Sequence, residues 1–291
     1  MGKLVCVPTL LCNKIKALTR GEKCAIIQNW KKEGGDKMIL AIDIGNTSIA
    51  LGGFEGDELK FVVRLSTDVT KTEDEYASKI LSILSLHNLT KNDVDGAIIS
   101  SVVPPLNSIM KNAIKFAYDV EPLMVCPGIK TGIGILCDSP SSVGADLICS
   151  CVAANTLYSA PALIIDIGTA TKMIVTNKNG AFIGVSIIPG VMMGLKALAN
   201  GTAQLPQVGL EAPLTVVGKN TVDCMKSGVI FGHASMMDGM IDRINAEVGE
   251  TLPVIVTGGY ASVIAPHCNH KMTIDEHLVL KGLNLIYLKN K

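Results

Sequence analysis

The chain has 291 residues, of which 48% are hydrophobic and 18% charged, and its 26 basic residues balance its 26 acidic residues. This composition predicts a folded chain of one large or two small domains and excludes a largely disordered one. The even charge balance argues against a nucleic-acid or anionic-membrane surface, and the sequence contains no apolar run long enough to span a bilayer. Nine irregularly spaced cysteines without a CxxC pair are typical of a reducing compartment, so we expect a cytoplasmic protein.

The first 37 residues differ in composition from the rest of the chain. They hold eight Lys or Arg residues against three acids, and they contain the only tryptophan, Trp30. The stretch Lys32-Glu33-Gly34-Gly35 can be encoded by purine-rich DNA that resembles a bacterial ribosome-binding site just before Met38. We therefore expect residues 1–37 to be an N-terminal extension that is untranslated leader read in frame.

Three strands are expected directly after this extension. Apolar runs over 38–43, 48–53 and 59–66 predict a hairpin sheet with a turn at 55–57. The segment TEDEYASKILSILSLHN then has apolar residues at helical spacing and acids in its first turn, which predicts an amphipathic helix. The run GAIISSVVPPL predicts a buried strand that ends at Pro104-Pro105, with a helix from about Asn107.

A second set of three strands is expected from residue 162. The segments ALIID, MIVTNKNG and AFIGVSIIPG predict them, with a hairpin turn at Asn179-Gly180. Helical segments and a short strand at PVIVTGG follow. In each set the first strand ends in an aspartate, Asp43 or Asp166, and a glycine turn follows it. We therefore expect a duplicated half-molecule rather than a short-period repeat.

Both turns combine a carboxylate with a close-approach glycine. Backbone N–H groups in such a turn can hold phosphate oxygens together with Thr hydroxyls, and Gly45 and Gly168 let the backbone come near a ligand. A carboxylate repels phosphate but can hold Mg²⁺ or its waters, so Asp43 and Asp166 are candidate metal ligands. A single Asp-Gly turn is an ordinary hairpin turn, but two such turns at equivalent places in the repeat favour a site that binds a triphosphate.

A third aspartate, Asp146, is expected near the N-terminal end of a helix that begins after Ser139-Pro140. An acid at this position can simply complement the helix dipole. The functional alternative is a general base that accepts the proton of an alcohol.

Taken together, these motifs resemble those of the type III pantothenate kinases. The matching segments, in the family's order, are DxGNT at 43–47, GAD at 144–146, DxGTAT at 166–171, IIPG at 187–190, GKNT at 218–221, SG at 227–228, TGG at 257–259 and LKGL at 280–283. They cover the chain from Met38 to about Tyr287, and the combination is far more specific than any single motif.

The resemblance implies an α/β fold of two duplicated ribonuclease-H-like halves around an ATP cleft, as in actin, the sugar kinases and the heat-shock ATPases. The halves would span 38–155 and 156–291. The implied reaction is phosphorylation of pantothenate by ATP to 4'-phosphopantothenate, the first step of coenzyme A biosynthesis. A homodimer, Mg²⁺ and a monovalent cation (NH₄⁺ or K⁺) are implied as well.

The resemblance also assigns roles to individual residues. Asp146 is the catalytic base, and Asp43 and Asp166 are the metal ligands. The ATP and phosphate residues are Asp43, Gly45, Asn46, Thr47, Gly168, Thr169, Thr171, Gly258 and Gly259. The substrate residues are Gly144, Ala145, Asp146 and Thr221.

Two residues depart from the family pattern on the pantothenate side. Leu147 stands where the family carries Arg, and Cys137 stands where it carries Tyr before the Asp138-Ser139-Pro140 segment. The loss of Arg removes a charge and up to five donors, so binding of the pantothenate anion is weakened unless Lys172 replaces the charge. Two alternatives to a pantothenate kinase therefore remain: a paralogue with another small-alcohol substrate, or a non-enzymatic accessory or regulatory protein.

Overall fold

The computed structural model describes residues 38–202, 205–206 and 208–291. The expected N-terminal extension, residues 1–37, and its interpretation as leader lie outside the described residues.

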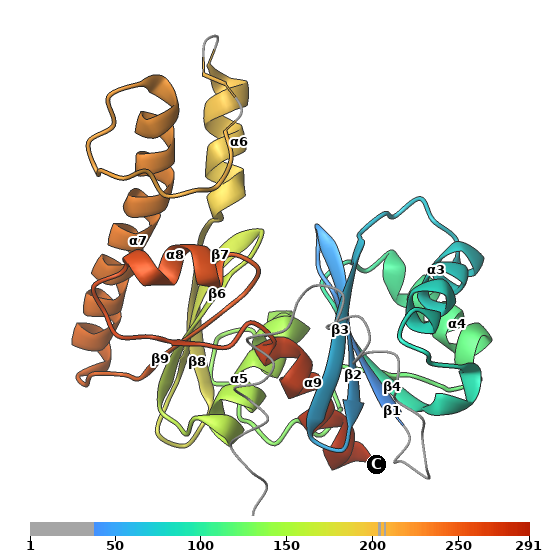
Figure 1. The fold of residues 1–291 in the computed structure, drawn as a ribbon. Helices are drawn as coiled ribbons and strands as arrows, with labels where there is room; N and C mark the ends of the chain where they lie inside the picture. Colours follow the sequence, from blue (N-terminus) through green and yellow to red (C-terminus); the bar gives the residue numbers. More distant parts are fainter. Residues whose placement is uncertain (1–37, 203–204, 207) are drawn as a thin grey trace, which may run out of the picture. The chain divides into compact units, whose positions relative to one another are not determined.

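The first sheet has five strands in the order β3-β2-β1-β4-β5 (Figure 1). They are β1 (Met38–Ile44), β2 (Ser48–Glu55), β3 (Glu58–Ser66), β4 (Val94–Ser101) and β5 (Leu123–Met124). β2 runs antiparallel to β1 and β3, whereas β4 runs parallel to β1 and β5. The three-stranded hairpin expected from the apolar runs is confirmed, and Gly56 supplies the positive φ of +58° at its second turn.

The second sheet repeats this arrangement. Its strands are β6 (Ala162–Ile167), β7 (Ala170–Thr176), β8 (Phe182–Pro189), β9 (Val254–Thr257) and β10 (Thr273–Ile274). The order β8-β7-β6-β9-β10 and the strand directions match those of the first sheet. The expected duplication is therefore confirmed, with β1 equivalent to β6 and β4 equivalent to β9.

Helices connect and cover the two sheets. Those in the described residues are α3 (Glu73–Ser85), α4 (Leu106–Tyr118), α5 (Ala145–Leu157), α6 (Val191–Gly201), α7 (Thr221–Val248), α8 (Ala261–Ile264) and α9 (Leu278–Asn290), with 3₁₀ turns η1 (Lys91–Asp93), η2 (Pro140–Ser142) and η3 (Ala265–His267). α3 begins where its sequence predicts, because the Thr72 hydroxyl accepts from the Glu75 N–H and the Glu75 carboxylate accepts from the Thr72 N–H.

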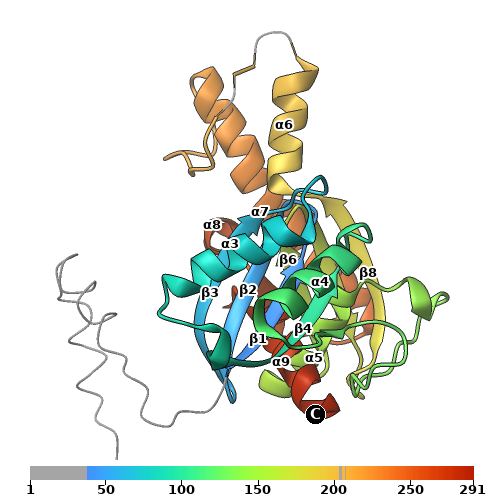
Figure 2. The ribbon, with the colours of Figure 1, turned by 90° about the vertical axis from the view of Figure 1, so that its right-hand side faces the viewer.

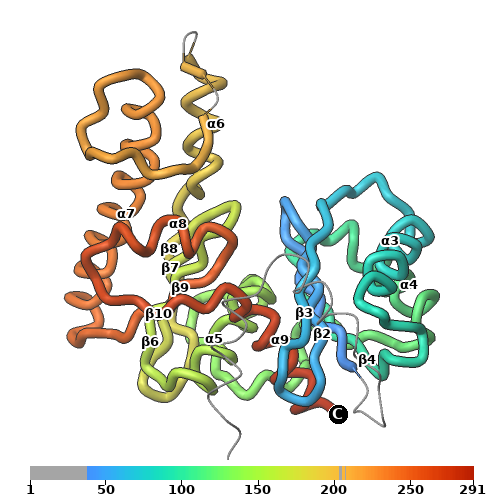
Figure 3. The backbone as a smooth tube through the Cα atoms, in the orientation of Figure 1, coloured from blue at the N-terminus to red at the C-terminus, as the bar shows by residue number. Residues whose placement is uncertain are grey.

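Each face of the first sheet has its own core. Alternate residues of β1 point to opposite faces, so that Leu40 and Ile42 pack with α3 and α4, while Ile39 and Ala41 pack with α5 and α9. α9 is the last helix of the chain, and Figure 3 shows the backbone crossing from β10 to lie along the first sheet. The core of the first sheet therefore needs residues from the C-terminus.

The helix α5 contacts both sheets. Cys149 and Val152 pack toward the first sheet with α9, whereas Leu147 and Cys151 pack toward the second sheet. Cys149 and Cys151 are fully buried, as expected for small core residues. The other face of the second sheet is covered by α7 and α8.

The N-terminal part of α7 is not part of that core. The buried α7 residues that pack on the second sheet begin at Ile230, and the preceding turns extend beyond the sheets together with α6 (Figures 1 and 2). In the part of the chain that the structure describes, no helix is both long and apolar enough to cross a membrane.

Candidate active site

The two glycine turns meet, although they are far apart in the sequence. Gly45, Asn46 and Thr47 connect β1 to β2, and Gly168 and Thr169 connect β6 to β7. The hydroxyl groups of Thr47 and Thr169 lie 2.8 Å apart, within hydrogen-bond distance. Both hydroxyls are exposed, so they are accessible to a ligand. The two turns are thus in direct contact.

Each turn is held by its own backbone. The Gly45 N–H donates to the Ser48 carbonyl at 3.1 Å, and the Gly168 N–H donates to the Ala170 carbonyl at 3.2 Å. The Thr67 hydroxyl donates to the Gly45 carbonyl at 2.6 Å, which ties the first turn to the end of β3. The turn conformations are therefore set before any ligand arrives.

Asp146 is the second residue of α5 and is buried. Its Oδ1 accepts a hydrogen bond of 2.9 Å from the Leu147 N–H, and the N-terminal dipole of the helix favours its negative charge. Gly144 precedes it as the N-cap, and a methyl group on Gly144 would stand 2.5 Å from Oδ1. Glycine at position 144 thus leaves room for the Asp146 carboxylate in the orientation that it has here.

Lys172 joins two of the three aspartates. Its ammonium group donates to Asp146 Oδ2 at 2.6 Å and to Asp166 Oδ2 at 2.8 Å. Burial opposes its charge, but the attraction of the two carboxylates outweighs this and raises the pKa of Lys172. Two of the three N–H donors of Lys172 are thus engaged by carboxylates.

Asp43 lies beside this group on the first sheet. Burial, together with repulsion from Asp146, raises the pKa of Asp43 to about 7. Lys172 attracts the Asp43 carboxylate electrostatically, but it forms its ion pairs with Asp146 and Asp166. Asp43 is therefore a carboxylate whose charged form needs a further cation.

This charge pattern fits a divalent cation. With all three aspartates in their charged form, they and the one ammonium group would carry a net charge of about −2, which Mg²⁺ would neutralise. Among the described residues, no group of three or more His, Cys, Asp or Glu side chains is arranged as a ready metal site. Mg²⁺ needs only one or two carboxylates when waters and phosphate oxygens complete its shell, so Asp43 and Asp166 Oδ1 are the residues that would hold it.

The other expected phosphate residues lie around Asp166. Gly258 follows β9 with a φ of +94°, and Gly259 next to it has open space around its Cα. Thr171 is fully buried in β7, and its hydroxyl lies 2.9 Å from His233 Nε2 on α7. Thr171 thus connects β7 to α7 through His233, a residue that no sequence motif indicated.

Thr221 is the one expected substrate residue that lies outside α5 and its N-cap. It is the exposed first residue of α7, in the part of that helix that extends with α6 beyond the sheets. None of the described hydrogen bonds or ion pairs joins it to the aspartates. Gly218 in the same GKNT motif packs against the backbone of Asp223 and Cys224, which explains the glycine by close packing.

The two departures from the family pattern share one environment. Leu147 is 7% exposed and Cys137 is partly buried, and both belong to the apolar cluster that includes Phe182. The sequence did not show this, since the two positions are ten residues apart and on different elements. An arginine at 147 would meet apolar side chains in this conformation, so its introduction is first of all a test of stability.

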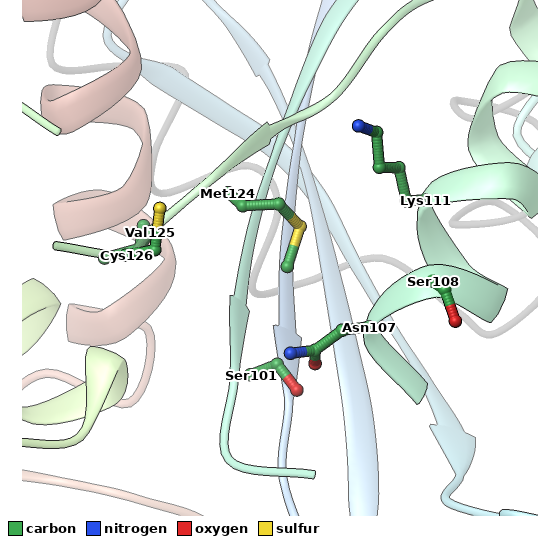
Figure 4. A pocket seen from close by; sticks show the side chains of 7 residues that line it. All are labelled: Ser101, Asn107, Ser108, Lys111, Met124, Val125 and Cys126. Atoms are coloured by element: carbon green, nitrogen blue, oxygen red, sulfur yellow. The ribbon is translucent and has the colours of Figure 1, made fainter. Parts of the chain in front are cut away.

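The structure also contains a cavity of about 230 Å³ beside α4 (Figure 4). Its lining consists of Ser101, Asn107, Ser108, Lys111, Met124, Val125 and Cys126. None of the residues expected to bind ATP, substrate or metal lines it, and Lys111 is paired with Glu121 at 2.6 Å. The cavity is therefore separate from the site formed by the aspartates.

Comparison with known proteins identifies relatives of this chain. The family model described as type III pantothenate kinase matches residues 39–243. Proteins named type III pantothenate kinase from Halalkalibacterium halodurans and Geobacillus sp. are 42% and 41% identical to this chain over 253 residues, which is 87% of this chain and 100% and 98% of theirs.

A solved structure shares the fold at low sequence identity. It is (R)-2-hydroxyglutaryl-CoA dehydratase component A from Acidaminococcus fermentans, with a TM-score of 0.51 and 16% identity over 88% of this chain and 98% of that one. This likeness concerns the fold alone. The family match and the identity to curated relatives decide the classification: the chain belongs to the type III pantothenate kinase family.

Proposed function

We propose that this chain phosphorylates pantothenate with ATP to 4'-phosphopantothenate and so begins coenzyme A biosynthesis. The observation that carries the proposal is the group formed by Asp146, Asp166 and Lys172, which lies with Asp43 at the two phosphate turns. Family membership agrees with a kinase, and the relatives named above are type III pantothenate kinases.

In this proposal the two turns hold the phosphates of ATP. The Thr47 and Thr169 hydroxyls, which now bond to each other, would turn toward phosphate oxygens, and the glycines let the backbone N–H groups approach. Asp43 and Asp166 would hold Mg²⁺, and the ion would supply positive charge for the phosphates of ATP.

Asp146 acts on the acceptor alcohol. The hydroxyl oxygen of pantothenate forms a bond to the γ-phosphorus while the bond from that phosphorus to ADP breaks. The hydroxyl proton passes to Asp146, which lies in the first turn of α5 and accepts a hydrogen bond from Lys172. General-base assistance of this kind contributes about 10²- to 10⁴-fold to the rate.

The acceptor side is expected to bind the pantothenate carboxylate weakly. Leu147 occupies the position of the family's Arg and is buried among apolar side chains. A lost charged hydrogen bond corresponds to about 1.5–3 kcal/mol, or roughly 10- to 100-fold in affinity. The same apolar cluster favours one second candidate, a paralogue that phosphorylates a small alcohol without the carboxylate.

A homodimer would explain why Thr221 lies away from the aspartates of its own chain and why apolar side chains near it are exposed. Leu214, Val216 and Val217 are exposed before α7, and Met193 and Leu198 are exposed on α6. Burial of this surface against a second copy would stabilise a dimer and bring Thr221 to a substrate site. The proposal also includes a cytoplasmic location and a requirement for K⁺ or NH₄⁺.

One assay tests the reaction, its acceptor and its requirement for a monovalent cation. ADP formation is measured with Mg-ATP in K⁺ buffer, with pantothenate, with pantothenol, or with neither, and again with Na⁺ in place of K⁺. We expect turnover that depends on pantothenate and on K⁺, with an ordinary KM for ATP and a high KM for pantothenate. A kcat/KM that is much greater for pantothenol indicates the second candidate, and no acceptor-dependent ADP formation refutes both.

A further inference from the structure

The two halves differ at one position next to their aspartates. In the first half, Asp43 on β1 is paired across the strands with Ala50 on β2. In the second half, the equivalent Asp166 on β6 is paired with Lys172 on β7. Cross-strand partners lie about 4.5–5.5 Å apart at Cβ, so Lys172 can reach the carboxylate of its partner and Ala50 cannot. The duplication itself thus provides an internal comparison.

We propose that Lys172 is a positioning residue whose ammonium group takes the place of a bound cation between Asp146 and Asp166, so that the divalent cation is confined to the Asp43 side of the site. This inference concerns the cation chemistry of the site and does not depend on which alcohol is phosphorylated.

The geometry is that of a cation held by two carboxylates. The ammonium nitrogen lies 2.6 Å from Asp146 Oδ2 and 2.8 Å from Asp166 Oδ2, within the range of charge-assisted hydrogen bonds. The side chains of all three residues are mostly buried, at 20% exposure for Lys172, 11% for Asp146 and 14% for Asp166. Solvent screening of these pairs is therefore weak, and a soluble cation cannot enter between the carboxylates while the amine remains.

The same bonds join elements from different parts of the site. Asp146 lies in the first turn of α5, whereas Asp166 and Lys172 lie on β6 and β7 of the second sheet. Lys172 thereby fixes the distance from the proposed base to the phosphate turn after β6. It uses only one oxygen of each carboxylate, so Asp146 Oδ1 still accepts from the Leu147 N–H and Asp166 Oδ1 still faces Gly258.

Removal of the amine should open a position for a metal ion. Lys172→Met keeps the length of the side chain without its charge, and Lys172→Gln keeps polar groups that help the site to fold. We expect both variants to bind Mn²⁺, followed by electron paramagnetic resonance of the free ion without nucleotide, at least about tenfold more tightly than the wild type. Lys172→Arg retains a fixed cation and should bind Mn²⁺ like the wild type.

A second substitution locates the new position. When Asp166→Asn is added to Lys172→Met, the gain in Mn²⁺ binding should disappear, because one of the two carboxylates is neutral. Thermal unfolding with and without Mn²⁺ gives an independent measurement, since a cation that replaces the amine should raise the Tm of Lys172→Met more than that of the wild type.

The outcomes separate this inference from the proposed function. Equal Mn²⁺ affinity in wild type and Lys172→Met overturns it, and so does a gain in Lys172→Arg as large as that in Lys172→Met. Failure of both neutral variants to fold even with Mn²⁺ also overturns it, because the metal should then replace the amine. None of these measurements requires turnover, so the absence of pantothenate kinase activity would leave the inference standing.

Discussion

Gly258 packs directly against the carboxylate of Asp166. A methyl group on Gly258 would stand 2.5 Å from Asp166 Oδ1, and the backbone of Gly258 has a φ of +94°. Both the space and the conformation therefore demand glycine. The TGG motif is needed because it leaves room for a carboxylate oxygen that we assign to the metal.

We expect Gly258→Ala to displace Asp166 and to weaken binding of Mg-ATP by about tenfold or more. Gly184→Ala in β8 is the control, because nothing lies within 4 Å of the methyl group it would add and Gly184 has no assigned role in the site. Isothermal titration with a non-hydrolysable ATP analogue and Mg²⁺ measures both variants. Equal effects of the two substitutions would contradict the role given to Gly258.

Asp146→Asn should lower turnover by about 10²- to 10⁴-fold, since the amide cannot take the proton of the alcohol. Binding of ATP should change little, because the assigned phosphate contacts come from the two turns. Asp43→Asn should instead weaken binding of the Mg²⁺-nucleotide complex as well. Steady-state kinetics with nucleotide titration separate the two patterns, and small, equal losses in both variants would exclude Asp146 as the base.

The raised pKa of Asp43 predicts a pH dependence of stability without divalent cations. Its pKa is about 7 in the folded chain and near 4 in the unfolded chain, so between these values the folded state alone holds the proton. Its contribution to the free energy of unfolding therefore falls as pH rises from about 4 to 7. Asp43→Asn, which has no such proton, should gain stability relative to the wild type across this window.

Thermal unfolding at pH 5 and pH 8 in chelator tests this expectation. The Tm difference between Asp43→Asn and wild type should be larger at pH 8, and Mg²⁺ should reduce it because the ion stabilises the charged wild-type carboxylate. Asp57→Asn, in the exposed turn after β2, is the control. If the Tm difference between wild type and Asp43→Asn is the same at pH 5 and pH 8, the raised pKa of Asp43 is contradicted.

Leu147→Arg should destabilise the chain, because it places a guanidinium group in the apolar cluster that contains Cys137 and Phe182. We expect a loss of roughly 2–5 kcal/mol in the free energy of unfolding. Leu147→Met keeps the volume and should cost less than about 1.5 kcal/mol. Urea unfolding compares the two, and an arginine variant as stable as the methionine variant would show that the position opens to solvent.

Much of the architecture could be predicted from the sequence. Apolar runs bounded by Gly56 and Gly180 predicted the hairpins, and the repeated aspartate at 43 and 166 predicted the duplication, because both signals are local. Asp146 was placed correctly at a helix start for the same reason. The assignment of separate halves at 38–155 and 156–291 remains a prediction, and α9 packs on the first sheet although it belongs to the second range.

The contacts of Lys172 could not be predicted. Its pairing with Asp166 depends on the register of β6 and β7, and a shift of one residue would turn it to the opposite face. Its bond to Asp146 depends further on how α5 packs between the sheets. The shared cluster of Leu147 and Cys137 is likewise a property of packing, for which the spacing in the sequence contains no signal.

Gly282 on α9 lies against the backbone of Cys149 on α5, with no room for a methyl group between the helices. Gly282→Ala should therefore push the helices apart and lower the free energy of unfolding by about 1–3 kcal/mol. Gly239→Ala on α7 faces open space and should be neutral or slightly stabilising, since alanine favours the helix. Chemical denaturation measures both, and similar values for the two would contradict the close packing.

The position of α9 also has a consequence for biosynthesis. The face of the first sheet that carries Ile39, Ala41 and Ile98 is covered by α5 and by α9, and the ribosome adds α9 long after the strands of that sheet. The nascent chain must therefore keep part of an apolar strand surface uncovered until α9 has been synthesised, although N-terminal segments usually fold first during synthesis. A stop codon just before α9 would remove this cover, so such a nonsense mutation should leave an aggregating product.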